Sequence, residues 1–161
     1  MTKIIAEIGW NHMGDLTIAE KMIQAAAENG ADYAKFQTWS VDRLKSGEWD
    51  DDGRRQIYEK AELSYDDHLT LIRMCRKYGV QFLSSVFSIK DAELLVSLGV
   101  REVKIPSFEC RNHKLIRYCD ENFDRIYMST GTSTWMLLRN ISQSIKTSQA
   151  AIINLQSYLM S

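Results

Sequence analysis

The chain has 161 residues, of which 45% are hydrophobic and 25% charged, and its 20 lysines and arginines stand against 21 aspartates and glutamates. This is the composition of a soluble globular protein that can bury one sizeable core. The balanced charge gives no reason to expect a nucleic-acid or membrane partner, and no apolar stretch approaches the roughly 20 residues that a membrane span needs.

The first predicted elements are a strand over residues 4–9 and a helix over residues 17–29. The run from Ile4 to Gly9 is apolar except for Glu7, which indicates a strand buried on both faces. The helix has an apolar side, and Gly30 is expected to end it. Because an unpaired buried carboxylate costs several kcal/mol, Glu7 must be paired or must line a polar cavity.

The same alternation of strand and helix recurs along the chain. Strands are predicted in YAKFQTW (33–39), VQFLSSVF (80–87), REVKIPS (101–107) and RIYMSTGT (125–132), and helices in residues 64–79, 90–99 and 113–123. Ser64 and Asp67 have the spacing of a helix-opening capping motif, and GEWDDDGRR (47–55) is expected to be a solvated loop. This alternation predicts parallel β-structure, as either a doubly wound sheet or a (β/α)8 barrel.

Polar residues lie at or near the carboxyl end of each predicted strand, which favours the barrel. They are Glu7, Lys35, Gln37, Ser84, Ser85, Lys104, Ser107, Ser129 and Thr130. Lys35 and Gln37 share a strand face, and parallel strands bring such ends together. Two lysines with several hydroxyls indicate an anion-binding site.

The remaining chemistry-bearing residues have simpler interpretations. Cys75, Cys110 and Cys119 lack the spacing of a disulfide framework or a zinc site. His12 is expected to bond within the first loop unless it is a ligand, and His68 and His113 are expected at surface or capping positions. The N-terminus leads into a strand rather than a signal peptide, so we expect a cytoplasmic location.

Five segments resemble, in this order, the strand motifs of the sialic acid synthase family, the N-acetylneuraminate synthases. They are AEIGWNHMGD, GADYAKFQTW, GVQFLSSVF, VKIPSFECRNHKLI and YMSTGTST. The resemblance covers about residues 4–134. Relatives that make legionaminic or pseudaminic acid, and a spore-coat polysaccharide protein, share these motifs, so the sugar is left open.

The resemblance implies a TIM barrel that condenses phosphoenolpyruvate with an N-acylated mannosamine-type sugar and uses a divalent metal, Mn²⁺ or Mg²⁺. Lys35 and Lys104 would neutralise the two anionic groups of phosphoenolpyruvate, with Ser107 and Ser129 as hydrogen-bond donors. By the same resemblance, Glu7 and Glu109 would be the catalytic carboxylates that face the sugar. Gln37 and Ser85 would be further substrate-binding residues.

The chain departs from the family after residue 134. Gln156 aligns with a metal-binding histidine of the family, a second such histidine has no counterpart, and we assign no metal ligand. Since a (β/α)8 barrel needs about 200–250 residues, we expect residues 1–161 to form its N-terminal portion, with parallel strands in about five or six βα units. The family's C-terminal antifreeze-like domain is then absent.

The expected function is therefore of the N-acetylneuraminate synthase type, a transferase activity that we do not expect from this chain alone. Two alternatives stay open: a non-catalytic remnant or interaction fragment of this fold, and another phosphate-binding barrel such as an aldolase or isomerase. Trapping of a Schiff base on Lys35 or Lys104 would indicate the aldolase. Full-length relatives are homodimers, and self-association of this chain is also left open.

Overall fold

The computed structural model describes residues 2–44, 46–131 and 150–153, in two compact units that divide at Ser84 and Ser85. The first unit contains β1 (Ile5–Gly9), α1 (Leu16–Glu28), β2 (Tyr33–Thr38), two short 3₁₀ turns (Val41–Arg43 and Glu48–Asp50), α2 (Arg54–Ala61) and α3 (Tyr65–Tyr78). Strand β3 (Gln81–Val86) runs from the first unit into the second. The second unit continues with α4 (Ile89–Ser97), β4 (Glu102–Ile105), a 3₁₀ turn (Ser107–Glu109), α5 (His113–Asn122), β5 (Arg125–Ser129) and β6 (Ala150–Ile153).

The strands are parallel, as the sequence predicted, and neighbours in the sheet follow chain order. In the first unit β1 pairs with β2, and in the second β3 pairs with β4, β4 with β5, and β5 with β6. Every strand and helix predicted from residues 4–132 is present, with ends that differ by one or a few residues. This arrangement places the carboxyl ends of the strands within each unit at one edge.

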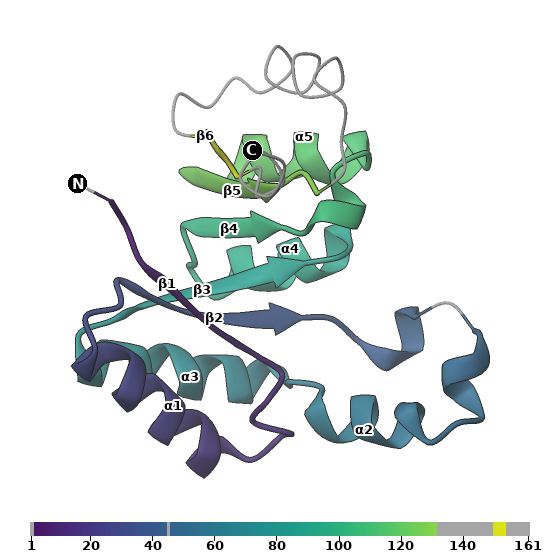
Figure 1. The fold of residues 1–161 in the computed structure, drawn as a ribbon. Helices are drawn as coiled ribbons and strands as arrows, with labels where there is room; N and C mark the ends of the chain where they lie inside the picture. Colours follow the sequence, from purple (N-terminus) through teal and green to yellow (C-terminus); the bar gives the residue numbers. More distant parts are fainter. Residues whose placement is uncertain (1, 45, 132–149, 154–161) are drawn as a thin grey trace, which may run out of the picture. The chain divides into compact units, whose positions relative to one another are not determined.

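The core of the first unit lies between β1 and β2 and the two helices α1 and α3, which lie side by side (Figure 1). Ile8, Ala34 and Phe36 of the strands pack with Ile23 of α1 and Leu71 of α3. The spacing of the apolar residues along both helices produces this buried face. In the second unit Leu95 of α4 and Leu115 of α5 are fully buried.

The capping motif predicted before α3 is confirmed. The Ser64 hydroxyl accepts a hydrogen bond from the Asp67 amide at 3.2 Å, and the Asp67 carboxylate accepts one from the Ser64 amide at 2.8 Å. Because these two bonds satisfy backbone donors at the helix start, they fix where α3 begins.

The prediction of a solvated loop over residues 47–55 is wrong in part, because α2 begins at Arg54. Ala61 is the buried residue of this helix, so the sequence has no apolar periodicity here from which a helix could be predicted. It is held by the Arg55–Asp50 ion pair at 2.6 Å and by Tyr58, whose ring packs edge-on against Trp10 and Trp39 at 5.6 and 5.7 Å.

Cys75, Cys110 and Cys119 are buried and free, in agreement with the predicted absence of a disulfide framework. Burial raises the pKa of the Cys75 and Cys119 thiols to about 12, so both stay protonated and unreactive near neutral pH. Across the residues that the structure describes, no helix has the length and apolarity required to cross a membrane.

Candidate functional site

Glu7 and Lys35 are partners across the parallel pair β1–β2, and Lys35 Nζ lies 2.6 Å from Glu7 Oε2. The Lys35 side chain is 3% exposed, whereas that of Glu7 is 55% exposed. The prediction that β1 is buried on both faces is therefore wrong, because β1 leaves Glu7 open to solvent while Ile8 faces the core. Burial lowers the pKa of Lys35, and the Glu7 carboxylate partly offsets this effect.

A β-bulge follows Glu7, because the register with β2 shifts by one residue between Glu7 and Gly9. Gly9 adopts a left-handed φ of 60°, and a Cβ there would lie 3.4 Å from Glu7 Oε1 and 3.8 Å from both Asn11 Nδ2 and Gln37 Nε2. The side chains of Glu7, Asn11 and Gln37 therefore surround the position that a side chain at Gly9 would occupy, and Glu7 is the strand partner of Lys35. Asn11, which the sequence analysis did not select, also donates to the Ile8 carbonyl at 2.8 Å.

A second polar group of the first unit is buried against α3. His68 Nδ1 lies 2.7 Å from the Ser64 carbonyl and must donate to it; in the neutral ring His68 Nε2 then accepts from the Thr38 hydroxyl at 2.9 Å. The Thr38 oxygen then accepts from Ser84 Oγ at 2.7 Å. The predicted surface position of His68 is wrong, since this side chain is fully buried.

His12 bonds within the first loop, as predicted, and is fully buried. Its Nδ1 accepts from the Gly14 amide at 3.0 Å, so Nε2 carries the proton, and Nε2 has no hydrogen-bond partner in the described structure. Burial lowers the pKa of His12 from its ordinary 6.5; Asp67 opposes this effect and His68 adds to it.

We expect the first unit to lose stability as the pH falls below 6.5. The unfolded chain protonates His12 near 6.5, whereas the folded state resists protonation, so unfolding takes up a proton between the folded pKa and 6.5. Protonation would also place a hydrogen on Nδ1, which faces the Gly14 amide. Urea unfolding at pH 7 and pH 5 measures the loss. His12→Asn, whose Oδ1 can still accept from Gly14, should lose less stability over this range than the wild type, and an equal loss would exclude His12 as the titrating group.

In the second unit Ser85 of β3 stands opposite Lys104 of β4, which stands opposite Tyr127 of β5. Ser129 is two residues beyond Tyr127 and therefore shares the strand face of Ser85 and Lys104. Ser85 is buried, and Lys104 and Ser129 are half-buried. Ser84 points to the opposite face from Ser85.

Ser107 and Glu109 lie in the 3₁₀ turn after β4. Ser107 packs against Gly131, where an added Cβ would lie 3.0 Å from the Ser107 Cβ, so the segments after β4 and β5 meet here. Glu109 Oε2 accepts from Asn112 Nδ2 at 2.8 Å, and the Asn112 side chain also caps α5. The start of α5 thereby orients the Glu109 carboxylate.

The structure brings Glu7, Lys35 and Gln37 together in the first unit, and Ser85, Lys104 and Ser129 onto one strand face of the second, with Ser107 and Glu109 in the turn that follows β4. Residues 2–44, 46–131 and 150–153 contain no group of three or more His, Cys, Asp or Glu side chains that could hold a metal ion. Gln156 lies outside the described residues.

Comparison with known proteins gives consistent matches. The sequence model of the NeuB family matches residues 22–158. The chain is 33% identical over 154 residues to the N,N'-diacetyllegionaminic acid synthase of Legionella pneumophila, covering 89% of this chain and 43% of that protein. It is 35% identical over 143 residues to the pseudaminic acid synthase of Helicobacter pylori, covering 82% and 42%. The chain thus spans less than half the length of these relatives.

Solved structures agree. The N-acetylneuraminic acid synthetase of Leptospira borgpetersenii superposes with a TM-score of 0.81 at 27% identity, over 94% of this chain and 52% of that one. The spore coat polysaccharide biosynthesis protein SpsE of Bacillus subtilis gives 0.79 at 33% identity, over 94% and 43%. These neighbours confirm the predicted parallel α/β fold of the TIM-barrel type, of which the chain covers a part. On the family match and the identity to its relatives, the chain belongs to the NeuB family.

Proposed function

We propose that residues 1–161 form the N-terminal portion of a synthase that condenses phosphoenolpyruvate with an N-acylated mannosamine-type sugar to give a nonulosonic acid. The relatives named as legionaminic and pseudaminic acid synthases support this class of reaction. The observation that carries the proposal is the Lys35–Glu7 pair, in which an ammonium 3% exposed is held at 2.6 Å by a solvent-open carboxylate. Because the Lys35 ammonium is already removed from water, an anion that reaches it would add little further cost for desolvating that cation.

In the proposed reaction the enol carbon of phosphoenolpyruvate bonds to the aldehyde carbon of the sugar. Water then adds to the cationic carbon that bore the phosphate, and inorganic phosphate leaves as its bond to that carbon breaks. Lys35, Lys104, Ser85, Ser107 and Ser129 supply positive charge and hydrogen-bond donors for the carboxylate and phosphate.

Glu7 and Glu109 take the proton-handling roles. One of these groups, in its carboxylic acid form, would donate the proton that the aldehyde oxygen gains, and the other, as a carboxylate, would accept the proton that the water loses. Gln37, whose amide nitrogen lies within 4 Å of the Cβ position at Gly9, as Glu7 Oε1 does, would bind sugar hydroxyls, since an amide offers both donor and acceptor groups.

A divalent metal, Mn²⁺ or Mg²⁺, remains part of the proposal because of the family resemblance, and it would polarise the aldehyde. The described segments of the chain do not provide a group of ligands that fits it. We therefore derive no step through a metal, and we expect no phosphate release from the 161-residue chain when it is given both substrates alone.

The proposal is tested by titrating phosphoenolpyruvate into the 161-residue chain and into Lys104→Met. We expect the variant to bind about 10- to 100-fold more weakly, because one hydrogen bond to a charged group contributes about 1.5–3 kcal/mol. Lys21→Met, which removes an exposed lysine of α1, should bind like the wild type. Equal affinity of Lys104→Met and wild type would remove Lys104 from the anion site, and absence of phosphoenolpyruvate binding in the wild type would contradict the proposed function.

A further inference from the structure

A groove of about 510 Å³ lies on the helical side of the second unit, and none of the residues proposed for the synthase site lines it. Its walls are formed by Ile89 at the start of α4 and by five residues of α5: His113, Lys114, Arg117, Tyr118 and Glu121. The α5 residues follow one another at helical spacing, so they form one side of the helix. The volume is in the range of small-molecule sites, roughly 300–1,000 Å³.

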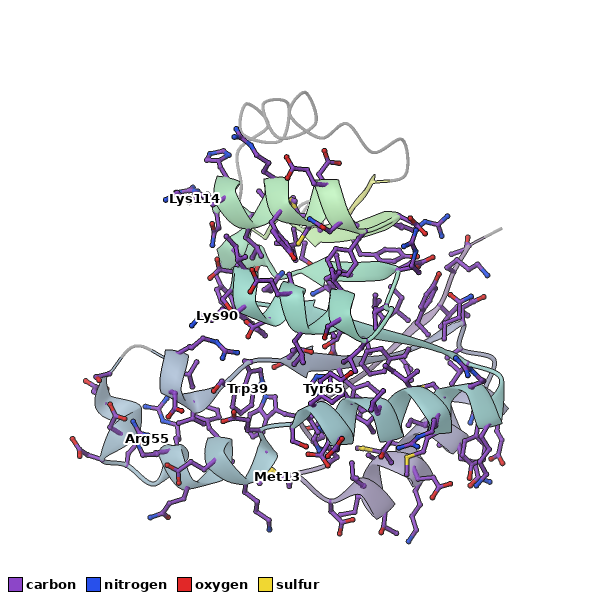
Figure 2. All side chains as sticks on the ribbon, turned by 180° about the vertical axis from the view of Figure 1, so that it is seen from behind. Met13, Trp39, Arg55, Tyr65, Lys90 and Lys114 are labelled. Carbon is purple, nitrogen blue, oxygen red and sulfur yellow. The ribbon has the colours of Figure 1, made fainter. Side chains whose placement is uncertain are left out.

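Unpaired positive charge lies in the part of this groove that is lined by Lys114 and Arg117. Lys114 and Arg117 are exposed, and neither makes an ion pair with any residue in the described part of the chain. Arg111, three residues before Lys114, and Lys90, which follows Ile89, are also exposed and make no ion pair with a described residue; Figure 2 shows Lys90 on α4 and Lys114 on α5. By contrast, several basic residues elsewhere are paired with carboxylates: Lys3, Lys35, Arg54, Arg55, Lys77, Arg101 and Arg125. Such a cluster attracts an anion with more than one negative charge.

The other end of the groove carries a negative charge, that of Glu121. Glu121 is exposed and makes no ion pair with Arg117 or with another described residue, although Arg117 is one helical turn away. At 1.5 Å per residue, Glu121 lies about 10–12 Å along the axis from Lys114 and His113. The half-buried ring of Tyr118 lies between these positions along the helix axis, and the aliphatic side chain of Ile89 also lines the groove.

We propose that this groove binds a nucleoside monophosphate. Its phosphate would lie at Lys114, Arg117 and the ring nitrogen of His113, because two cations and a further donor match a dianion. Its base would stack on Tyr118 against Ile89, and an amino or hydroxyl group at the far end would donate to Glu121. A ligand with an anionic end, a flat apolar middle and a donor end, spread over about 10–12 Å, matches the order of these side chains. The inference does not rest on the synthase activity.

The test is calorimetric titration of the 161-residue chain with adenosine 5′-monophosphate, inorganic phosphate and adenosine. We expect the nucleotide to bind at least tenfold more tightly than either part alone, because both ends of the groove are then used. Arg117→Glu should weaken nucleotide binding at least tenfold, whereas Arg76→Glu, the same change at an exposed arginine of α3, should leave it within about twofold of wild type. Glu121→Met should weaken binding of the nucleotide but not of inorganic phosphate.

Each remaining outcome overturns the proposal. Absence of nucleotide binding in the wild type, or an equal loss in Arg76→Glu, would show that the charges do not form a site. If inorganic phosphate bound as tightly as the nucleotide, the base would contribute nothing to binding in the groove. Because the nucleotide could also enter the anion site at Lys104, the titrations are repeated with Lys104→Met and with phosphoenolpyruvate. Arg117→Glu should leave phosphoenolpyruvate affinity unchanged, so a failure here is distinct from a failure of the proposed synthase function.

Discussion

Gly14→Ala is expected to destabilise the first unit by about 2–5 kcal/mol. Gly14 has a left-handed φ of 77°, and a Cβ there would lie 1.9 Å from the Lys60 carbonyl oxygen of α2. An alanine in this conformation costs about 1–2 kcal/mol, and forcing atoms into a filled space adds about 1–3 kcal/mol. The overlap involves backbone on both sides, so no side-chain rotation relieves it.

The consequences extend beyond Gly14, because its amide donates to His12 Nδ1 and its loop carries Trp10, which packs on Tyr58 of α2. Moving the loop away from α2 weakens both contacts. Urea unfolding of the variant measures the total loss.

Gly30→Ala is the matched control. Gly30 has nearly the same φ, 79°, but a Cβ there would meet no atom within 4 Å. This variant should lose only the conformational part, about 1–2 kcal/mol. If both variants lost the same amount, the close approach of Gly14 to Lys60 would contribute nothing to stability.

The order of elements could be predicted from the sequence because it depends on local patterns. Alternating apolar runs and amphipathic segments indicated the strands and helices, and the Ser64–Asp67 capping motif spans only four residues. Features that depend on distant contacts could not be predicted. Helix α2 lacks an apolar face, and Tyr58 is held by Trp10 and Trp39 from other segments.

The candidate site shows the same division. Polar residues at strand ends identified Glu7, Lys35 and Lys104 as site candidates, because parallel strands align their carboxyl ends. The sequence could not show that Glu7 is exposed, since the bulge after Glu7 and the burial of Lys35 arise from the pairing of β1 with β2. The predicted surface position of His68 was wrong for a related reason. The pattern of helix α3 does not show that the Thr38 hydroxyl of another segment forms a hydrogen bond with the His68 ring.

Glu7→Gln is expected to destabilise the first unit, and Lys35→Met is expected not to. Removing one partner of a fully buried ion pair costs about 3–5 kcal/mol. Since the Glu7 side chain is 55% exposed and water screens the pair, the loss should fall below that range. Methionine at position 35 removes the buried charge and keeps an apolar side chain of similar length, so its cost is small.

The pH dependence separates this electrostatic account from a loss of packing. Burial holds the pKa of Lys35 below 10.5 in the folded protein, and Glu7 opposes that shift. The unfolded chain therefore binds the Lys35 proton more tightly, and stability rises with pH between the folded pKa and 10.5. Without the Glu7 carboxylate the folded pKa falls further, so the rise begins at a lower pH and is larger.

Urea unfolding of wild type, Glu7→Gln, Lys35→Met and the double variant at pH 7, 8.5 and 10 measures these differences. The Glu7→Gln variant should recover part of its lost stability as the pH rises. The rise in stability that comes from the Lys35 proton should be absent in Lys35→Met and in the double variant. When Glu7→Gln is made in the Lys35→Met protein, it should have almost no effect on stability, because no buried lysine charge is then left without its partner. An equal cost of Glu7→Gln with and without Lys35 would show that Glu7 does not act through the ion pair. Glu7 would then stabilise the first unit through contacts other than Lys35.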